Sequence, residues 1–155
     1  MSEQRIAAIT LDERSVLRRS PEIEHERAAA IADLLHGNSF APVSGQAGPF
    51  NLHLAVEENR LAFDVTGADR TSEAIQLPLA PFRRIVKDYF VICESYYDAE
   101  RRHNLTQVEA IDAGRRALHN EGAALLIERL GDKVAIDHNT GRRLFTLICV
   151  LHLRA

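Results

Sequence analysis

Three neighbouring segments of the chain alternate between apolar and polar side chains, and this pattern constrains the fold more than any other feature. The segments are residues 51–57, 60–66 and 73–79, with an apolar side chain at every second position. Such alternation gives each strand one buried and one solvated face, which is typical of antiparallel rather than parallel sheets. Glu58-Asn59 suits a tight turn between the first two segments. The pattern therefore predicts an antiparallel meander.

The residues before the meander predict one further strand and one helix. Residues 5–11 have the composition of a strand, which ends at acidic side chains. Ser20-Pro21 suits the start of a helix, because serine is a good N-cap and proline fits the first turn. Gly37 suits the end of that helix. The following residues, up to Pro49, are expected to form a loop.

The residues after the meander predict mainly helices. An apolar stripe at helical spacing predicts a helix over residues 81–102. A capping box that begins at Thr106 predicts the next helix, which we expect to end at Gly131. Residues 133–137 are expected to form a short strand. Residues 142–153 are expected to form a buried helix, and the alternative is that their apolar run forms a buried strand.

Together these segments predict an α+β fold in a single domain over residues 1–155. We expect an antiparallel sheet of about four strands, with one face covered by three to four helices. The strand, the first helix and the meander fall in residues 1–80, and the helical portion follows in residues 81–155. A length of 155 residues with 46% hydrophobic residues is sufficient for one core without a disulfide or a structural metal.

Composition also sets expectations for the cellular compartment. Cys93 and Cys149 each lie in an apolar stretch without a Cys-x-x-Cys spacing, so we expect two buried thiols. The first residues lack the pattern of a signal peptide, and the longest apolar block is too short to span a bilayer. These features predict a soluble cytoplasmic protein. A formal net charge of -3 with only two lysines argues against nucleic-acid binding.

Two adjacent cations stand where a helix start ordinarily favours anions. Arg83 and Arg84 lie in the first turn of the second predicted helix, and Lys87 follows one turn later. Positive charges there oppose the helix dipole by about 0.3–1 kcal/mol each. A bound phosphate or carboxylate would explain their placement. The alternative is that these arginines pair with the chain's own carboxylates, either in the acidic N-terminal half or at Asp88.

The same arrangement recurs near the C-terminus. Arg142 and Arg143 would occupy the first turn of the last segment if a helix began there near Thr140. Arginine suits the bidentate recognition of carboxylate and phosphate groups. The second pair therefore supports the same hypothesis of anion recognition.

A second polar cluster lies in the third predicted helix. Arg115, Arg116, His119 and Glu121 fall within seven residues, and Arg115 shares a helix face with His119 at i, i+4 spacing. A histidine beside carboxylates and arginines can perform general acid–base chemistry. The alternative is a kink near Gly122 that a polar network holds in place.

The sequence gives little indication of a metal or a cofactor. Glu22-x-x-His25 and Glu100-x-x-His103 match a spacing found in di-iron bundles, but such a site needs two further glutamates in a four-helix bundle. Phosphate-loop, dinucleotide-binding, zinc-protease and nucleophile-elbow motifs are absent from the sequence. We therefore expect neither a metal nor a cofactor.

Several stretches resemble a known family. They are residues 23–27, 38–42, 81–90, 95–98, 110–112, 118–122 and 142–152. They are similar to uncharacterised protein family 0262, whose members are small bacterial proteins of about this length. The resemblance covers nearly the whole chain. It implies a bacterial cytoplasmic protein, and it carries over no activity, ligand or catalytic residue.

From these observations we expect a non-enzymatic binding or regulatory module. It would recognise an anionic small molecule or an acidic protein partner through the Arg83-Arg84 pair and Lys87, and it could form a homo-oligomer. The alternative is a small enzyme that acts on a phosphorylated or carboxylated metabolite, with a pocket built from the cluster around His119. Neither nucleic acid nor a membrane is expected as a partner.

Overall fold

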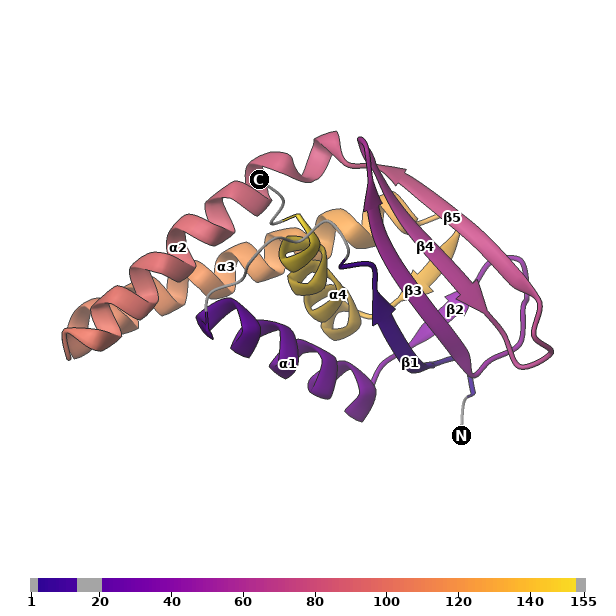
Figure 1. The fold of residues 1–155 in the computed structure, drawn as a ribbon, viewed down its shortest axis with the longest axis horizontal. Coiled ribbons are helices and arrows are strands. Elements are labelled where there is room, and N and C mark those ends of the chain that lie inside the picture. The colour runs from indigo at the N-terminus through magenta and orange to yellow at the C-terminus, as the bar shows by residue number, and fades with distance from the viewer. Residues whose placement is uncertain (1–2, 14–20, 153–155) are drawn as a thin grey trace.

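Four helices lie on one side of a four-stranded sheet in the computed structural model, which describes residues 3–13 and 21–152 (Figure 1). The elements are, in chain order, β1 (Ile6–Leu11), α1 (Pro21–His36), β2 (Phe40–Pro42), β3 (Phe50–Glu57), β4 (Arg60–Thr66), β5 (Ser72–Pro78), a 3₁₀ turn (Ala80–Phe82), α2 (Arg83–Arg101), α3 (Leu105–Leu130), β6 (Val134–Ile136) and α4 (His138–Leu151). The α+β class predicted from the sequence is confirmed.

The central sheet has the strand order β1-β3-β4-β5. The predicted meander is confirmed, because β3, β4 and β5 pair antiparallel. The register aligns Leu54 with Phe63 and Phe63 with Ile75, so that three buried side chains lie side by side on the face that the helices cover. The apolar alternation thus fixes which face of the sheet enters the core.

The first strand corrects one part of the prediction. β1 lies parallel to β3, with Leu11 opposite Leu54, so the sheet is mixed rather than wholly antiparallel. Parallel neighbours need a long crossover connection, usually through a helix. The chain provides this crossover because α1 lies between β1 and β3. Alternation within β1 by itself does not distinguish the two directions.

The predicted loop after α1 contains a further strand. β2 pairs antiparallel with β6, with Ala41 opposite Ala135. The expectation of a short strand at residues 133–137 is confirmed, whereas the expectation of loop throughout residues 38–49 is wrong. β2 has three residues, and its partner strand lies more than 90 positions away along the chain. A strand this short is too short to show a recognisable alternation of apolar and polar residues.

The helix ends agree with the sequence signals at some positions and differ at others. α1 ends at His36, directly before Gly37, and it begins at Pro21; the predicted cap Ser20 lies outside the described residues. The predicted capping box at Thr106 is wrong. α3 is capped by Asn104, whose side chain accepts a hydrogen bond of 3.1 Å from the backbone N–H of Gln107.

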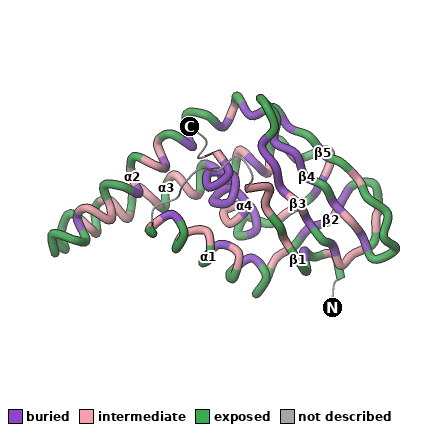
Figure 2. Tube along the Cα trace, in the orientation of Figure 1, coloured by how far each residue is buried: buried purple, intermediate pink, exposed green. Residues whose placement is uncertain are grey.

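The open question about the last segment is answered in favour of a helix. α4 is capped by Asp137, whose carboxylate accepts a hydrogen bond of 2.8 Å from the backbone N–H of Thr140. Every residue from Leu144 to Leu151 is buried. α4 packs against α1, α3 and β3, and it lies at the centre of the molecule (Figure 2). One hydrophobic core therefore joins both halves of the chain.

α2 and α3 form a hairpin that extends away from the sheet (Figure 1). The turn between them contains His103, which adopts a left-handed backbone conformation with φ 58°. None of the described helices is both long enough and apolar enough to cross a bilayer.

Gly122 is required by a close contact between α3 and α4. A Cβ atom at this position would lie 2.5 Å from Cγ of the Phe145 ring. The helix continues through Gly122 without interruption. The glycine lets the aromatic ring of α4 approach the backbone of α3.

We predict that Gly122→Ala lowers the free energy of unfolding by about 1–3 kcal/mol, because the buried Phe145 ring must move. Gly114→Ala in the same helix is the matched control. Its Cβ would meet only Cδ1 of Ile92, at 2.7 Å, the end of a flexible side chain, and alanine favours the helix by about 1 kcal/mol. Urea denaturation of both variants tests this, and an equal loss of stability would contradict it.

Candidate functional site

A buried carboxylate joins the first three helices. Glu26 of α1 accepts hydrogen bonds from the hydroxyl groups of Tyr89 (2.8 Å) and Tyr97 (2.6 Å), both on α2. The guanidinium of Arg115 on α3 lies 3.5 Å from the same carboxylate. Glu26 is only 12% exposed and Arg115 18%. Charges at this depth are stable only when they are paired and hydrogen-bonded, and here they are.

Burial sets the protonation of the groups around Glu26. It raises the pKa of Tyr89 and of Tyr97, and the negative charge of Glu26 raises both further. The phenols therefore remain protonated and act as donors. Burial opposes the charge on Arg115, but Glu26 and Asp112 outweigh that effect and its pKa lies above its usual value. At neutral pH the two phenols are therefore neutral donors and Arg115 is a cation.

Arg115 has further contacts that fix its position. It donates a hydrogen bond of 3.0 Å to Asp112 one turn earlier on α3. Its guanidinium carbon also lies 4.1 Å from the centre of the Tyr96 ring, in a cation–π contact. The Arg115 Nε atom is buried without a hydrogen-bond partner among the described residues. The side chain nevertheless links α1, α2 and α3.

His119 lies one turn beyond Arg115 and is uncharged at neutral pH. Its ring packs near the Tyr89 ring, with centroids 5.2 Å apart, and its Nε2 atom is 3.5 Å from Oγ1 of Thr146 on α4. Burial, and after it the positive charge of Arg142, lower the pKa of His119 to about 4. The pairing of Arg115 with His119 on one face, predicted from their spacing, is present in the structure.

A small hollow of about 150 Å³ opens beside His119, between α1, α3 and α4. Its lining combines polar side chains with two alanines, and consists of Glu26, Ala29, Ala30, Asp33, His119, Arg142, Arg143 and Thr146. The polar groups come from three helices, whereas the alanines belong to α1 alone. The tertiary fold therefore assembles this site from segments far apart in the sequence.

Two arginines of the hollow each have one N–H group, at Nε, that is buried without a hydrogen-bond partner among the described residues. The Nε atoms of Arg142 and Arg143 are buried, and neither has a hydrogen-bond partner within residues 3–13 and 21–152. Arg143 donates one hydrogen bond of 3.0 Å from Nη1 to the carbonyl of Asn139. No carboxylate of the described chain lies within 4.0 Å of a side-chain nitrogen of either arginine. Unpartnered buried donors of this kind need an explanation.

The start of α4 corrects one expectation about these arginines. Because the cap is Asp137, α4 begins at His138. Arg142 and Arg143 therefore lie in the second turn rather than in the first turn predicted from a start near Thr140. Their charges therefore lie beyond the free backbone N–H groups at the start of the helix. Both side chains line the hollow instead.

The Arg83-Arg84 pair is placed where the sequence predicted, at the first two residues of α2. Arg84 forms ion pairs of 3.0 Å with Asp88 and with Glu121, and Arg83 donates a hydrogen bond to the side-chain oxygen of Asn59. Lys87 is exposed. The alternative raised from the sequence, pairing with the chain's own carboxylates, thus describes Arg84 but not Arg83. Anion binding by this group remains a prediction.

The structure divides the predicted cluster around His119. Glu121 faces Arg84 of α2, away from the hollow. Arg116 is exposed and pairs with Asp112 at 3.4 Å. Only Arg115 and His119 come together, because helical spacing places residues 119 and 121 on different sides of α3. The expected pocket of His119 with Glu121 is therefore not formed.

Sequence reasoning missed the residues that complete the site. Glu26 has a signal that could have identified it, since it lies between Ile23 and Ala30 on the buried stripe of α1. A carboxylate on an apolar stripe requires a buried partner. Thr146 lies in a strongly apolar segment and had no comparable signal.

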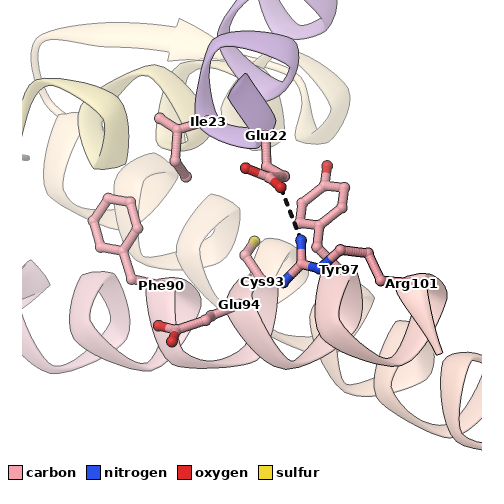
Figure 3. A pocket seen from close by; sticks show the side chains of 7 residues that line it. All are labelled: Glu22, Ile23, Phe90, Cys93, Glu94, Tyr97 and Arg101. Carbon is pink, nitrogen blue, oxygen red and sulfur yellow. Dashed lines mark hydrogen bonds and ion pairs between the residues drawn. The ribbon is translucent and has the colours of Figure 1, made fainter. Parts of the chain in front are cut away.

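A larger hollow of about 320 Å³ lies between α1 and α2 (Figure 3). Its walls include Ile23, Phe90 and the thiol of Cys93, and Arg101 bonds Glu22 across it at 2.9 Å. Burial raises the pKa of Cys93 to about 11, so its thiolate form is scarce at neutral pH. The thiol of Cys93 is therefore not an activated nucleophile in this hollow.

The fold and the site define an α+β domain with a small arginine- and histidine-lined hollow. In the part of the chain that the structure describes, no three His, Cys, Asp or Glu side chains come together as metal ligands would. The chain belongs to the uncharacterised protein family UPF0262, whose family model matches residues 3–154. The resemblance noted from the sequence is therefore confirmed.

Relatives of similar length occur in several bacteria. A UPF0262 protein of Rhodospirillum rubrum is 59% identical over 147 residues, which cover 94% of this chain and 91% of the relative. One of Nitrobacter winogradskyi is 55% identical over 152 residues (97% and 91%), and one of Paramagnetospirillum magneticum is 54% identical over 152 residues (97% and 97%). No solved structure matches the chain. The names of these relatives give the family and no activity. The comparison therefore assigns no function to this chain.

The low pKa of His119 predicts a specific dependence of stability on pH. The unfolded chain takes up a proton near pH 6.5, whereas the folded chain does so only near pH 4. The contribution of neutral His119 to the free energy of unfolding is therefore complete above pH 6.5 and is lost as the pH falls toward 4. Between pH 7.5 and pH 5 we expect His119→Asn to reduce the acid-induced loss of unfolding free energy by about 2 kcal/mol.

Urea denaturation at both pH values provides the measurement. His36→Asn is the matched control, because His36 is exposed at the end of α1 and its removal should leave the pH dependence unchanged. Identical pH dependence in the wild type and in His119→Asn would show that His119 titrates normally.

Proposed function

We propose that this protein is a non-catalytic binding module for a small anion, and that its site is the hollow between α1, α3 and α4. The observation that carries this proposal is the pair of buried Nε donors on Arg142 and Arg143, which have no acceptor among the described residues. Carboxylate and phosphate oxygens are the usual acceptors for such donors. The proposal keeps the ligand class predicted from the sequence and moves the site from the start of α2 to α4.

The electrostatics of the hollow support an anionic ligand. At His119 the lowering of the pKa by Arg142 exceeds the raising by Glu26. Glu26 is already engaged by two phenols and by Arg115. Its negative charge is therefore compensated locally, whereas the charges of Arg142 and Arg143 are not. An anion that enters the hollow would be attracted to the side formed by Arg142 and Arg143.

The start of α2 has weaker support as the anion site. Arg84 already has two carboxylate partners there, and it is largely exposed. Exposed pairs of this type contribute little energy and are readily screened by salt. An anion at this position would have to compete with Asp88 and Glu121 for the same guanidinium.

A catalytic use of the hollow is less well supported than binding. The Thr146 hydroxyl donates its proton to the carbonyl of Arg142 at 3.2 Å. His119 Nε2 must then donate toward Thr146 rather than accept from it. His119 is consequently not oriented as a base for this hydroxyl, and Glu121, the other expected acid–base group, points elsewhere. Binding without turnover is the simpler function for this geometry.

We also propose a cytoplasmic location. Cys93 and Cys149 are both buried and unpaired, and reduced cysteines are typical of the cytosol.

A hollow of about 150 Å³ suits a small molecule better than a protein segment. We therefore favour a small-molecule anion over an acidic protein partner.

The test is thermal unfolding in sodium phosphate and in sodium acetate, with ionic strength held constant by chloride. We expect either anion to raise the Tm of the wild type by a few degrees, because ligand binding to the folded state stabilises it. The double variant Arg142→Gln/Arg143→Gln should lose this shift while its circular dichroism spectrum stays native. Arg83→Gln/Arg84→Gln is the matched control and should retain it.

Two results would contradict the proposal. The first is a wild-type protein whose Tm responds to neither anion. The second is a shift that disappears only in Arg83→Gln/Arg84→Gln, which would place the anion at the start of α2, as the sequence alone predicted.

A further inference from the structure

We infer that the ligand is a small zwitterion, with an anionic group held by Arg142 and Arg143 and a cationic amine held by Asp33. This inference rests on the proposed function and adds the chemical class of the ligand. The observation behind it is that Asp33, a carboxylate on α1, lines the same hollow as the two arginines.

The helices bring Asp33 toward the arginines. Glu26, Ala30 and Asp33 lie on one face of α1, at the spacing of successive helical turns. The C-terminal end of α1 lies beside the start of α4, because the backbone N–H of Ser39 donates to the Thr140 hydroxyl at 3.0 Å. The last turns of α1, with Asp33, therefore border the turn of α4 that contains the arginine pair.

Asp33 is exposed and uncommitted, unlike Glu26. Within the described ranges it has neither an ion pair nor a side-chain hydrogen bond, although Arg142 and Arg143 line the same hollow. The acidic Asp33 and the two arginines thus line one space, but no ion pair of 4.0 Å or less joins them. A ligand that carries both charges can bridge them. A simple anion leaves the carboxylate of Asp33 as a repulsive neighbour.

The size of the hollow limits the ligand to a few heavy atoms. About 150 Å³ is well below the roughly 300–1,000 Å³ of typical drug-sized ligand pockets. Ala29 and Ala30 leave this space open on the side of α1, and a larger side chain at either position would narrow it. Glycine and β-alanine fit these limits, and each carries an ammonium and a carboxylate group.

The experiment compares zwitterions with single-charge analogues on the full chain at pH 7.5. Glycine, β-alanine, acetate and methylammonium are titrated separately, and binding is followed by NMR of the His119 ring protons, which border the hollow. In the wild type we expect glycine or β-alanine to bind at least about tenfold more tightly than acetate. Asp33→Asn should reduce that preference to about onefold without weakening acetate. Asp64→Asn, an exposed acid on β4, should change neither.

The outcomes separate this inference from the proposed function. If acetate binds through Arg142 and Arg143 but the zwitterions bind no more tightly, or if Asp33→Asn leaves their preference intact, the inference is overturned and the anion site stands. If neither acetate nor a zwitterion binds the wild type, both fail. If Arg142→Gln/Arg143→Gln abolishes binding of the zwitterions and Asp33→Asn removes only their preference, both are supported.

Discussion

The buried C-terminal half of α4 organises the packing of the other elements. Leu144 to Leu151 are all buried, and all but Thr146 are apolar, so neighbouring elements must cover this stretch from several directions. α3 covers one side closely enough to require Gly122, α1 covers another, and the inward face of the sheet completes the shell.

The polar network around Glu26 is the second organising feature, and it lies at the edge of that core. A carboxylate at this depth stabilises the fold only while its partners remain, because a lone buried charge is costly. Two phenols from α2 and one guanidinium from α3 satisfy it. The network thereby fixes α1 against the hairpin with directional contacts, where apolar packing alone would allow sliding. His119 lies half-buried beside this network, where burial and the charge of Arg142 lower its pKa.

The hollow exists because α4 changes character along its length. Its C-terminal half is mostly apolar and buried, whereas its N-terminal half carries Arg142 and Arg143, whose charged head groups are costly to place in the core. α1 faces these arginines with Ala29 and Ala30, which are too small to fill the gap. A space with unpartnered donors results at the junction of three helices. Such a space is the kind of concave site where small ligands bind.

Most of the local elements, and the face that each one buries, could be predicted from the sequence. Alternation in β3, β4 and β5 and helical spacing in α1 and α2 are properties of a few consecutive residues, so they can be read without the fold. Tertiary structure alone decided the direction of β1, the pairing of β2 with β6, and the choice of helix for α4. It also decided which polar groups meet: Arg84 contacts Glu121, 37 residues away, and Glu26 contacts Tyr97, 71 residues away.

Periodicity specifies which face of an element is buried but not the partner on that face, because the partner depends on how whole elements pack. For this reason arginines could be recognised as unusual from the sequence, whereas the pair that lacks acceptors emerged only from the packing of α1, α3 and α4.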